Sequence, residues 1–338
     1  MRILIYSRAF APSIGGLEGT MQLFAEGAVA RGHDIRVVTA TPGGPAAAGS
    51  FAIHRNPSWA TLKSDFGWAD IVLLGGMSLR GLLLSFVFRT PAVVSHQTML
   101  TVEGWRGAGR AALKTSLTRL TRNISASRAI ANALPGPSRI IPNPYDNDVF
   151  RTLPAVARND DLIFVGRLVS DKGAAGLLRA VRMVADEGIR FTLTIVGDGP
   201  ERPVLESLVD SLGLRGQVSF AGRRSPEEIC RMLNAHRVLV VPSLWEEPFG
   251  IVALEGIACG CYVVATRGGG LPEAVGECGE FFPNGDDAAL AAILRRLDLH
   301  HDWSPPESLV AERHLQKFRK PAFVRDYLSF LGEACGAS

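Results

Sequence analysis

The chain has 338 residues, of which 47% are hydrophobic and 20% charged, and its formal net charge is +3. This length suits about two domains of ordinary size, and the composition excludes a disordered or fibrous chain. The most apolar stretch, residues 79–94, is interrupted by two arginines, a glycine and a proline, so we expect no membrane-spanning helix.

The first residues, MRILIYSRAF, pass directly into a strand-like run without the apolar core and cleavage site of a signal peptide. The five cysteines form no CxxC pair and have no histidine at metal-ligand spacing. We therefore expect a cytoplasmic protein with free thiols, without disulfides or a zinc site.

Positive charge is concentrated in the first half of the sequence. Residues 1–155 contain 16 Lys and Arg against 8 Asp and Glu, whereas the remainder contains 20 against 25. Seven cations and no acid lie within residues 104–145. This pattern indicates either a solvated helix face or a face that meets an anionic partner, such as an acceptor or a membrane surface reached through residues 104–139.

Strand-like and helix-like segments alternate from the start of the chain. A helical pattern that ends near Gly32 follows the first strand. Because strands alternating with helices form right-handed βαβ units, the pattern predicts a parallel sheet. Strands are expected in this first half at residues 2–6, 35–40, 71–74, 92–95, 123–127 and 139–143.

The alternation stops in the polar segment 151–160 and then begins again. Ser225 to Glu228 reads as a capping box that opens a helix. The chain is therefore expected to contain two doubly wound domains, at residues 1–155 and 156–318, with a cleft between the carboxyl ends of their sheets. A last helical pattern lies within residues 319–338.

Glycine-rich turns follow the first strand of each expected domain. In the first, Gly15, Gly16 and Gly19 allow close backbone approach before a helix, which fits either a phosphate site or an ordinary turn. In the second, Arg167 and Lys172 lie near a helix start, where cations are unfavourable unless an anion is bound. Two solvated surface cations are the alternative.

The stretch LWEEPFGIVALEGIACGC, residues 244–261, places carboxylates among apolar residues. Pro248 excludes Glu247 from a helix that is expected to begin near Gly250, and Glu255 then lies in its second turn. The two acids could border one elongated ligand, and the amides at the helix start would be free donors.

Taken together, these stretches resemble the retaining GT-B glycosyltransferases, glycosyltransferase family 4 in particular. EPFGIVALEG resembles the Glu-x7-Glu motif of that family, GGLE its phosphate loop and GRLVSDKG its diphosphate clamp. VGDGPE, GGLPEAV and IIPNPYDNDVF resemble three further family segments. The resemblance implies the GT-B fold, with two Rossmann-like domains facing across a cleft. Residues 1–155 would bind the acceptor, residues 156–318 would bind the nucleotide sugar, and the helix in 319–338 would return to the first domain.

The resemblance also implies roles for the matching positions. Glu255 would bind the ribose hydroxyls and Glu247 those of the donor sugar, while Arg167 and Lys172 would neutralise the diphosphate. His96, at a strand end, would lie near the transferred sugar, although by itself it better fits a satisfied polar group. The implied catalytic residues are Arg167, Lys172, Glu247 and His96, and the implied donor-binding residues are Gly15, Gly16, Gly166, Gly197, Phe249, Gly250, Ile251 and Glu255.

The activity implied is transfer of a hexosyl group, with retention, from a UDP- or GDP-sugar to a glycan or lipid-linked acceptor in cell-envelope, polysaccharide or glycoconjugate synthesis. No cofactor and no obligatory metal are implied. Asp146 and Asp148 imitate an Asp-x-Asp metal motif, but their place before the linker favours coincidence. Nucleic acid is not an expected partner, because the basic stretch lacks aromatics beyond Trp105. A nucleotide-sugar epimerase and a non-catalytic nucleotide-sugar-binding module remain the alternatives.

Overall fold

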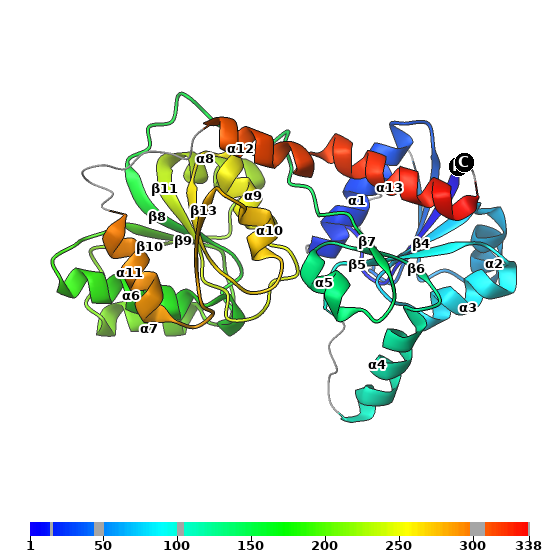
Figure 1. Ribbon diagram of the computed structural model, residues 1–338, viewed down its shortest axis with the longest axis horizontal. Coiled ribbons are helices and arrows are strands. Elements are labelled where there is room, and N and C mark those ends of the chain that lie inside the picture. The colour runs from blue at the N-terminus through cyan, green and yellow to red at the C-terminus, as the bar shows by residue number, and fades with distance from the viewer. Residues whose placement is uncertain (14–15, 44–50, 100–104, 298–307, 337–338) are drawn as a thin grey trace. The chain divides into compact units, whose positions relative to one another are not determined.

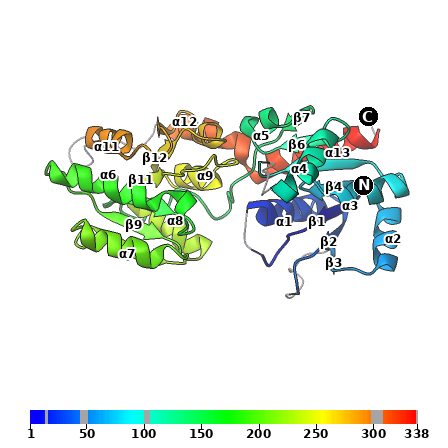
Figure 2. The same ribbon diagram turned by 90° about the horizontal axis from the view of Figure 1, so that it is seen from below.

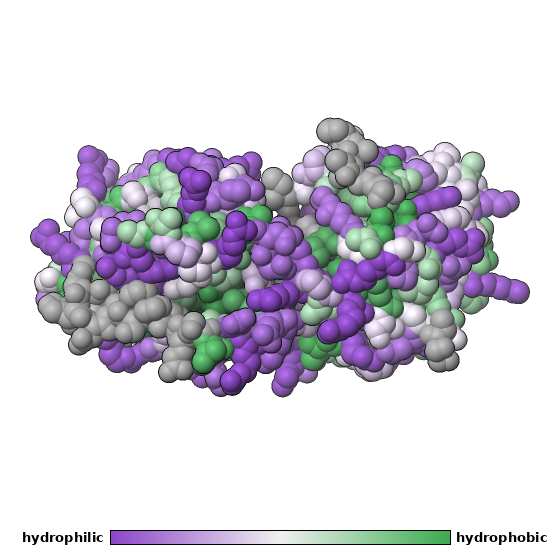
Figure 3. All heavy atoms as spheres, turned by 90° about the horizontal axis from the view of Figure 1, so that it is seen from above, coloured by the Kyte–Doolittle hydropathy of each residue, from purple (hydrophilic) through white to green (hydrophobic). Residues whose placement is uncertain are grey.

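The computed structural model describes residues 1–13, 16–43, 51–99, 105–297 and 308–336. The chain divides into two compact units, drawn in Figure 1. Unit 1 comprises Met1–Pro144 with Lys320–Ser338, and unit 2 comprises Tyr145–Arg319. Among the described residues no helix is long and apolar enough to cross a membrane. Hydrophilic residues cover most of the face shown in Figure 3.

Unit 1 is built on a seven-stranded sheet in the order β3-β2-β1-β4-β5-β6-β7, and every pair of neighbouring strands is parallel. The order reverses between β1 and β4, as in a doubly wound sheet. The strands are β1 (Arg2–Ser7), β2 (Asp34–Thr39), β3 (Ala52–Arg55), β4 (Ile71–Gly75), β5 (Ala92–His96), β6 (Arg122–Ser125) and β7 (Ser138–Ile140).

The last helix of the chain packs in the core of unit 1, alongside α1 (Figure 1). Phe323 and Tyr327 are buried there, and the Tyr327 hydroxyl lies 2.8 Å from Ser95 Oγ. A Cβ added at Gly27 of α1 would lie 2.5 Å from Val324, so the absence of a side chain permits this close packing. The helices of unit 1 are α1 (Gly16–Val29), α2 (Trp59–Trp68), α3 (Leu79–Phe88), α4 (Trp105–Leu117), α5 (Arg128–Ala133) and α13 (Lys320–Cys335).

Unit 2 has a six-stranded parallel sheet in the order β10-β9-β8-β11-β12-β13, and its order reverses between β8 and β11. The two units therefore confirm the predicted pair of doubly wound parallel sheets. The strands are β8 (Asp160–Val165), β9 (Leu193–Val196), β10 (Val218–Gly222), β11 (His236–Val241), β12 (Tyr262–Thr266) and β13 (Gly279–Phe282).

Helices cover both faces of this sheet, as Figures 1 and 2 show. One core contains side chains of α6, α7 and α11, and the other contains those of α8, α9, α10 and α12. The capping box is present at the start of α8, with Ser225 and Glu228 as predicted. The helices are α6 (Ala174–Asp186), α7 (Arg202–Ser211), α8 (Pro226–Ala235), α9 (Ile251–Ala258), α10 (Leu271–Val275), α11 (Asp287–Arg296) and α12 (Ser308–Leu315), with short 3-10 turns at Ser170–Lys172 and Gln316–Phe318.

The units divide after Pro144, earlier than the boundary at residue 155 that the polar linker suggested. The reason is packing: Tyr145 and Phe150 are buried in the second core of unit 2, together with Phe249 and Phe318. The segment before residue 156 is therefore held by unit 2 through apolar side chains.

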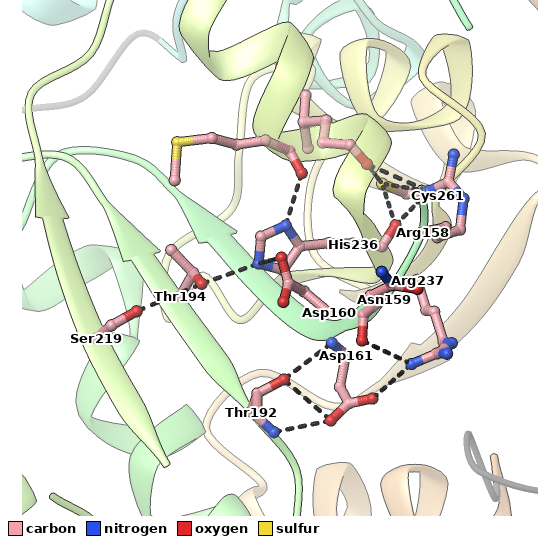
Figure 4. A network of polar contacts seen from close by, with 12 residues as sticks. Arg158, Asn159, Asp160, Asp161, Thr192, Thr194, Ser219, His236, Arg237 and Cys261 are labelled. Atoms are coloured by element: carbon pink, nitrogen blue, oxygen red, sulfur yellow. Dashed lines mark hydrogen bonds and ion pairs between the residues drawn. The ribbon is translucent and has the colours of Figure 1, made fainter. Parts of the chain in front are cut away.

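A polar network closes the amino ends of β9, β8 and β11 in unit 2 (Figure 4). Asp161 accepts hydrogen bonds from the Thr192 amide at 2.8 Å and from Arg237 Nη1 at 2.9 Å. His236 Nε2 lies 2.9 Å from Thr194 Oγ1, and burial lowers the pKa of this histidine, which keeps the ring neutral near pH 7. Arg158 reaches the His236 and Cys259 carbonyls. Each of these side chains has hydrogen-bond partners inside the unit, whereas Gln217 Oε1, directly before β10, is buried without one among the described residues.

We expect Asp161→Ala to lower the free energy of unfolding by roughly 2 kcal/mol, because it removes the carboxylate that accepts hydrogen bonds from the partly buried Arg237 and from the Thr192 amide. Asp186→Ala removes an exposed Arg-Asp pair of α6 and should cost less than about 1 kcal/mol. Urea unfolding of both variants tests the difference, and equal losses would contradict a stabilising role for the network.

Candidate functional site

The carboxyl ends of the unit 2 strands carry the residues singled out in the second half of the sequence. The loop after β8 carries Arg167 and Lys172, and the loop after β11 carries Glu247. Because the strand order reverses between β8 and β11, these loops border the place where doubly wound sheets bind ligands.

Lys172 and Glu247 form an ion pair across this place. Lys172 Nζ lies 2.5 Å from Glu247 Oε1, and Ser243 Oγ donates to the same oxygen at 2.6 Å. The Glu247 side chain is 10% exposed and that of Lys172 is 21% exposed, so the pair is largely removed from water. Oε2 of Glu247 has no partner among the described residues, which leaves an acceptor available to a ligand hydroxyl.

Close backbone contacts hold the loops after β8, β11 and β12 against one another around this pair. Gly173 has a φ of +72°, and an added Cβ would lie 1.9 Å from the Pro242 carbonyl oxygen. Gly269 has a φ of +65° and faces the Glu247 carbonyl, at 2.1 Å from an added Cβ. The neighbouring Gly270 amide donates to that carbonyl at 2.7 Å. Any larger residue would separate the loops, so the glycines fix the position of Glu247.

The glycines at the ends of β8 and β9 meet in the same way. A Cβ added at Gly197 would lie 1.8 Å from the Gly166 carbonyl oxygen. Gly197 is thus required for the close approach of the two loops, independently of any ligand, whereas a Cβ at Gly166 would meet only the Phe164 ring, at 3.2 Å.

Helix α9 begins at Ile251, directly after Gly250, so the start predicted from Pro248 is confirmed. Phe249 is buried and packs on Phe318 with ring centroids 5.7 Å apart, which anchors the helix start in the core. Glu255 lies in the second turn. Burial raises the pKa of its carboxyl to about 7, and the negative charge of Asp146 adds to the shift.

Buried polar atoms without hydrogen-bond partners gather at this edge of unit 2. They include Asp171 Oδ1 after β8, Trp245 Nε1 after β11 and Thr266 Oγ1 at the end of β12. Orphaned buried polar atoms are rare in folded proteins, since each costs roughly 1–3 kcal/mol. Three of the four such atoms in the described part of unit 2 lie here, the fourth being Gln217 Oε1 at the amino edge, and this grouping is typical of a site that completes its hydrogen bonds with a ligand.

Several residues around the site had not been recognised from the sequence. Asn284 Nδ2 donates to the Ser243 carbonyl at 3.0 Å, and the Trp245 ring lies 5.6 Å from Lys172 Nζ. Ser243 lies two residues after the apolar run of β11, and such a position just beyond a strand end was the available signal. Arg167 is exposed and has no acidic partner among the described residues.

The remaining candidates lie in unit 1. His96 is 2% exposed, and its Nε2 lies 3.0 Å from Asn123 Oδ1; burial lowers its pKa. Gly15 lies outside the described residues. Gly16 and Gly19 belong to the first turn of α1, not to a loop as expected. A Cβ added at either would meet no atom within 4 Å, so packing requires glycine at neither position.

Asp146 and Asp148 have a local structural explanation. Asp146 Oδ1 accepts from the amides of Asp148 at 3.1 Å and Val149 at 3.4 Å, as an acid that closes a turn does. Within the described residues, no group of three or more His, Cys, Asp and Glu is placed to hold a metal ion. All five cysteines are free thiols, as predicted.

Unit 1 has a pocket of about 590 Å³ at its own point of reversal, formed at the ends of β1, β2 and β4. Three cations line it: Arg8 after β1, Arg80 at the start of α3 and Lys114 on α4. The described lining contains no acid, and none of the three cations pairs with a described acid. The pocket therefore favours an anionic ligand.

Residues 148–303 match the family model described as glycosyl transferases group 1. The D-inositol 3-phosphate glycosyltransferase of Corynebacterium jeikeium is 39% identical over 164 residues, which cover 46% of this chain and 39% of that protein. The 2-deoxystreptamine glucosyltransferase of Streptomyces kanamyceticus is 32% identical over 196 residues, covering 54% and 50%. The chain thus spans about half the length, or less, of the curated relatives it matches.

Solved structures resemble the chain over nearly its whole length. HepE of Anabaena in complex with UDP has a TM-score of 0.82 at 21% identity, over 98% of this chain and all of that one. A glycosyltransferase from Rickettsia africae has a TM-score of 0.82 at 17% identity, over 100% and 99%. At these identities the likeness shows the fold, which is the predicted GT-B fold.

The raised pKa of Glu255 has a consequence for stability. Between its ordinary value of 4.5 and about 7, the carboxyl ionises in the unfolded chain while it stays protonated in the folded one. The free energy of unfolding therefore falls as the pH rises through this window and stays lowered above it.

We expect Glu255→Gln to match the wild type near pH 4.5 and to exceed its stability by up to about 3 kcal/mol above pH 7. Urea unfolding at several pH values measures this, with Glu246→Gln at an exposed neighbouring position as control. A difference that does not change with pH would show that Glu255 does not titrate in this window.

Proposed function

We propose that this chain, whose residues 148–303 match the family model of glycosyl transferases group 1, transfers a hexosyl group from a nucleoside diphosphate sugar to an acceptor. The observation that carries the proposal is the pairing of Lys172 with Glu247 where the strand order of unit 2 reverses. That place offers a cation, a carboxylate oxygen without a partner and orphaned polar atoms side by side.

The diphosphate would bind to Arg167 and Lys172. Both follow β8, and Arg167 has no described acid to neutralise it. A cation about 4 Å from a phosphate oxygen, at an effective dielectric near 20, contributes about 4 kcal/mol before desolvation. That is comparable to general acid catalysis, which supplies a hundred- to ten-thousandfold, or roughly 3–5 kcal/mol. The two cations would therefore stabilise the leaving group without a protein acid.

The two carboxylates would bind hydroxyl groups of the donor. Oε2 of Glu247 is available for the sugar, while Oε1 remains held by Lys172 and Ser243. Glu255 would accept the ribose hydroxyls in its ionised form. Since its pKa is about 7 in the free protein, nucleotide binding below that pH would release a proton.

Retention of configuration would follow from attack on the same face, with the leaving phosphate accepting the proton of the acceptor hydroxyl. Because the acceptor would attack directly on the same face, the proposed reaction assigns Glu247 no nucleophilic role. The proposed reaction uses no cofactor and no obligatory metal. The Anabaena structure contains UDP, so uridine nucleotides are the first donors to test, followed by those of guanosine.

The acceptor would bind in the pocket of unit 1. Arg8, Arg80 and Lys114 give that pocket a positive potential, which suits an acceptor that carries phosphate or carboxylate groups. A glycan with such groups and a lipid-linked phosphate both meet this description.

We expect Lys172→Ala and Glu247→Ala each to reduce transfer at least a thousandfold, and Glu255→Ala chiefly to raise the KM for the donor. Glu246→Ala, at the exposed neighbour of Glu247, should retain the wild-type rate. Transfer of a radiolabelled sugar measures all four variants. Wild-type turnover by Lys172→Ala or Glu247→Ala would remove these residues from the site.

A thermal-shift panel of nucleoside diphosphates and their sugars identifies the donor. A ligand present at a hundred times its Kd adds about 2.7 kcal/mol of stability, which is readily seen as a higher Tm. Stabilisation without turnover over a broad acceptor panel would favour the non-catalytic binding module. Stabilisation by no nucleotide would contradict the donor site itself.

For the acceptor pocket, we expect the double variant Arg80→Ala, Lys114→Ala to raise the KM for an anionic acceptor at least tenfold and to leave nucleotide affinity unchanged. Lys63→Ala removes an exposed cation of α2 outside the pocket and serves as the control. Equal loss of donor binding in the double variant would show that the pocket is not specific to the acceptor.

A further inference from the structure

Helix α3 in unit 1 presents large apolar side chains to solvent. Leu83, Phe86 and Val87 are 62%, 82% and 58% exposed. Their spacing places them on one face of the helix, opposite Leu84 and Ser85, which are buried. The buried face of α3 supplies its contacts with the core, so polar residues at positions 83, 86 and 87 would not weaken the core.

The exposed face continues beyond α3. Leu120, which follows α4, is 83% exposed, and with Leu117 it lines the same groove as Leu83, Phe86 and Val87, about 1000 Å³ in volume. We call these five residues the α3 surface. Contiguous exposed apolar areas are uncommon on monomeric proteins and mark places of interaction.

Cations border the α3 surface. Arg89 and Arg122 line the groove, and Arg119 is exposed beside Leu120. Neither Arg89 nor Arg119 pairs with a described acid, and Arg122 donates to a backbone carbonyl, that of Glu333. Residues 71–145 contain nine Lys and Arg but one acid, Glu103, which lies outside the described residues. Apolar side chains bordered by arginines that no described acid neutralises match the interface of a bilayer that contains anionic lipids.

We propose that the α3 surface docks unit 1 on an anionic lipid bilayer, with Leu83, Phe86 and Leu120 entering the interface and the arginines meeting lipid phosphates. Lipid binding of this kind requires only unit 1 and stands apart from the proposed function. Where that function holds, docking has a consequence for the acceptor: Arg80, on the same helix, lines the pocket of unit 1, so a lipid-linked acceptor would be available where the protein docks.

A second copy of the chain fits this surface less well. A two-fold interface pairs the same patch on both copies, which would bring the unneutralised Arg89 and Arg119 of one copy toward those of the other. Like charges held close together oppose association, whereas lipid phosphates neutralise them.

Vesicle sedimentation of the full chain, without donor or acceptor, tests the proposal. The vesicles are phosphatidylcholine alone or with about a third phosphatidylglycerol, at low and at high salt. The wild type should partition into the anionic vesicles at low salt and at least tenfold less into phosphatidylcholine alone. Phe86→Ser should lower the partition coefficient about tenfold, and Arg89→Ala about fivefold.

Leu120→Ser and Leu309→Ser form a matched pair, because both leucines are highly exposed and the second lies in unit 2. Only Leu120→Ser should lower binding. Thermal unfolding verifies that every variant is folded, and analytical ultracentrifugation gives the oligomeric state.

Absence of wild-type binding to anionic vesicles would overturn the proposal, as would equal binding by wild type and Phe86→Ser. A wild-type dimer that Phe86→Ser converts to a monomer would assign the surface to self-association instead. Because nucleotide binding is measured separately in unit 2, failure of vesicle binding leaves the proposed function standing, and the reverse also holds.

Discussion

The Lys172-Glu247 ion pair is the constraint around which unit 2 is arranged. It joins the loops after β8 and β11, which are adjacent only because the strand order reverses between them. Removing two charges from water costs several kcal/mol, and mutual attraction seldom repays it with a surplus. Glycines at Gly173 and Gly269 are nevertheless required to bring the loops into register around the pair. Because such a pair adds little to the stability of the fold, its presence is better explained by a ligand that binds both charges.

The interior strands of both sheets were predictable because strands buried on two faces read as continuous apolar runs. The edge strands β3 and β13 were not recognised. Each has four residues, and most of their side chains are only half-buried, so neither carries a clear run. The end of unit 1 was misplaced for a related reason: the polar segment 151–160 looked like a linker, while Tyr145 and Phe150, which decide the boundary, are single aromatic residues in a polar context.

Within the site, the features that depend on neighbouring residues could be predicted from the sequence, whereas contacts between distant residues could not. Pro248 acts on its own neighbours, so the start of α9 and the separation of Glu247 from Glu255 followed from the sequence. The partners Lys172 and Glu247 were both singled out, yet their contact joins residues 75 positions apart and depends on strand order. The prediction for Gly16 and Gly19 was wrong. They were expected in a loop, but both belong to α1 despite the low helix propensity of glycine, and neither has a positive φ.

The amino and carboxyl ends of the unit 2 strands differ in how far their buried polar groups are satisfied by hydrogen bonds. At the amino edge, Asp161 and His236 have their hydrogen bonds supplied from within the unit. At the carboxyl edge, Asp171, Trp245 and Thr266 each bury a polar atom without a partner, and Glu255 holds its proton to about pH 7. A sequence selected for stability alone would satisfy or replace these groups. Three of the four buried polar atoms that lack partners among the described residues of unit 2 lie on this side of the sheet, and Gln217 Oε1 lies on the other. Most of these unfavourable terms therefore lie at the surface where a ligand can offset them.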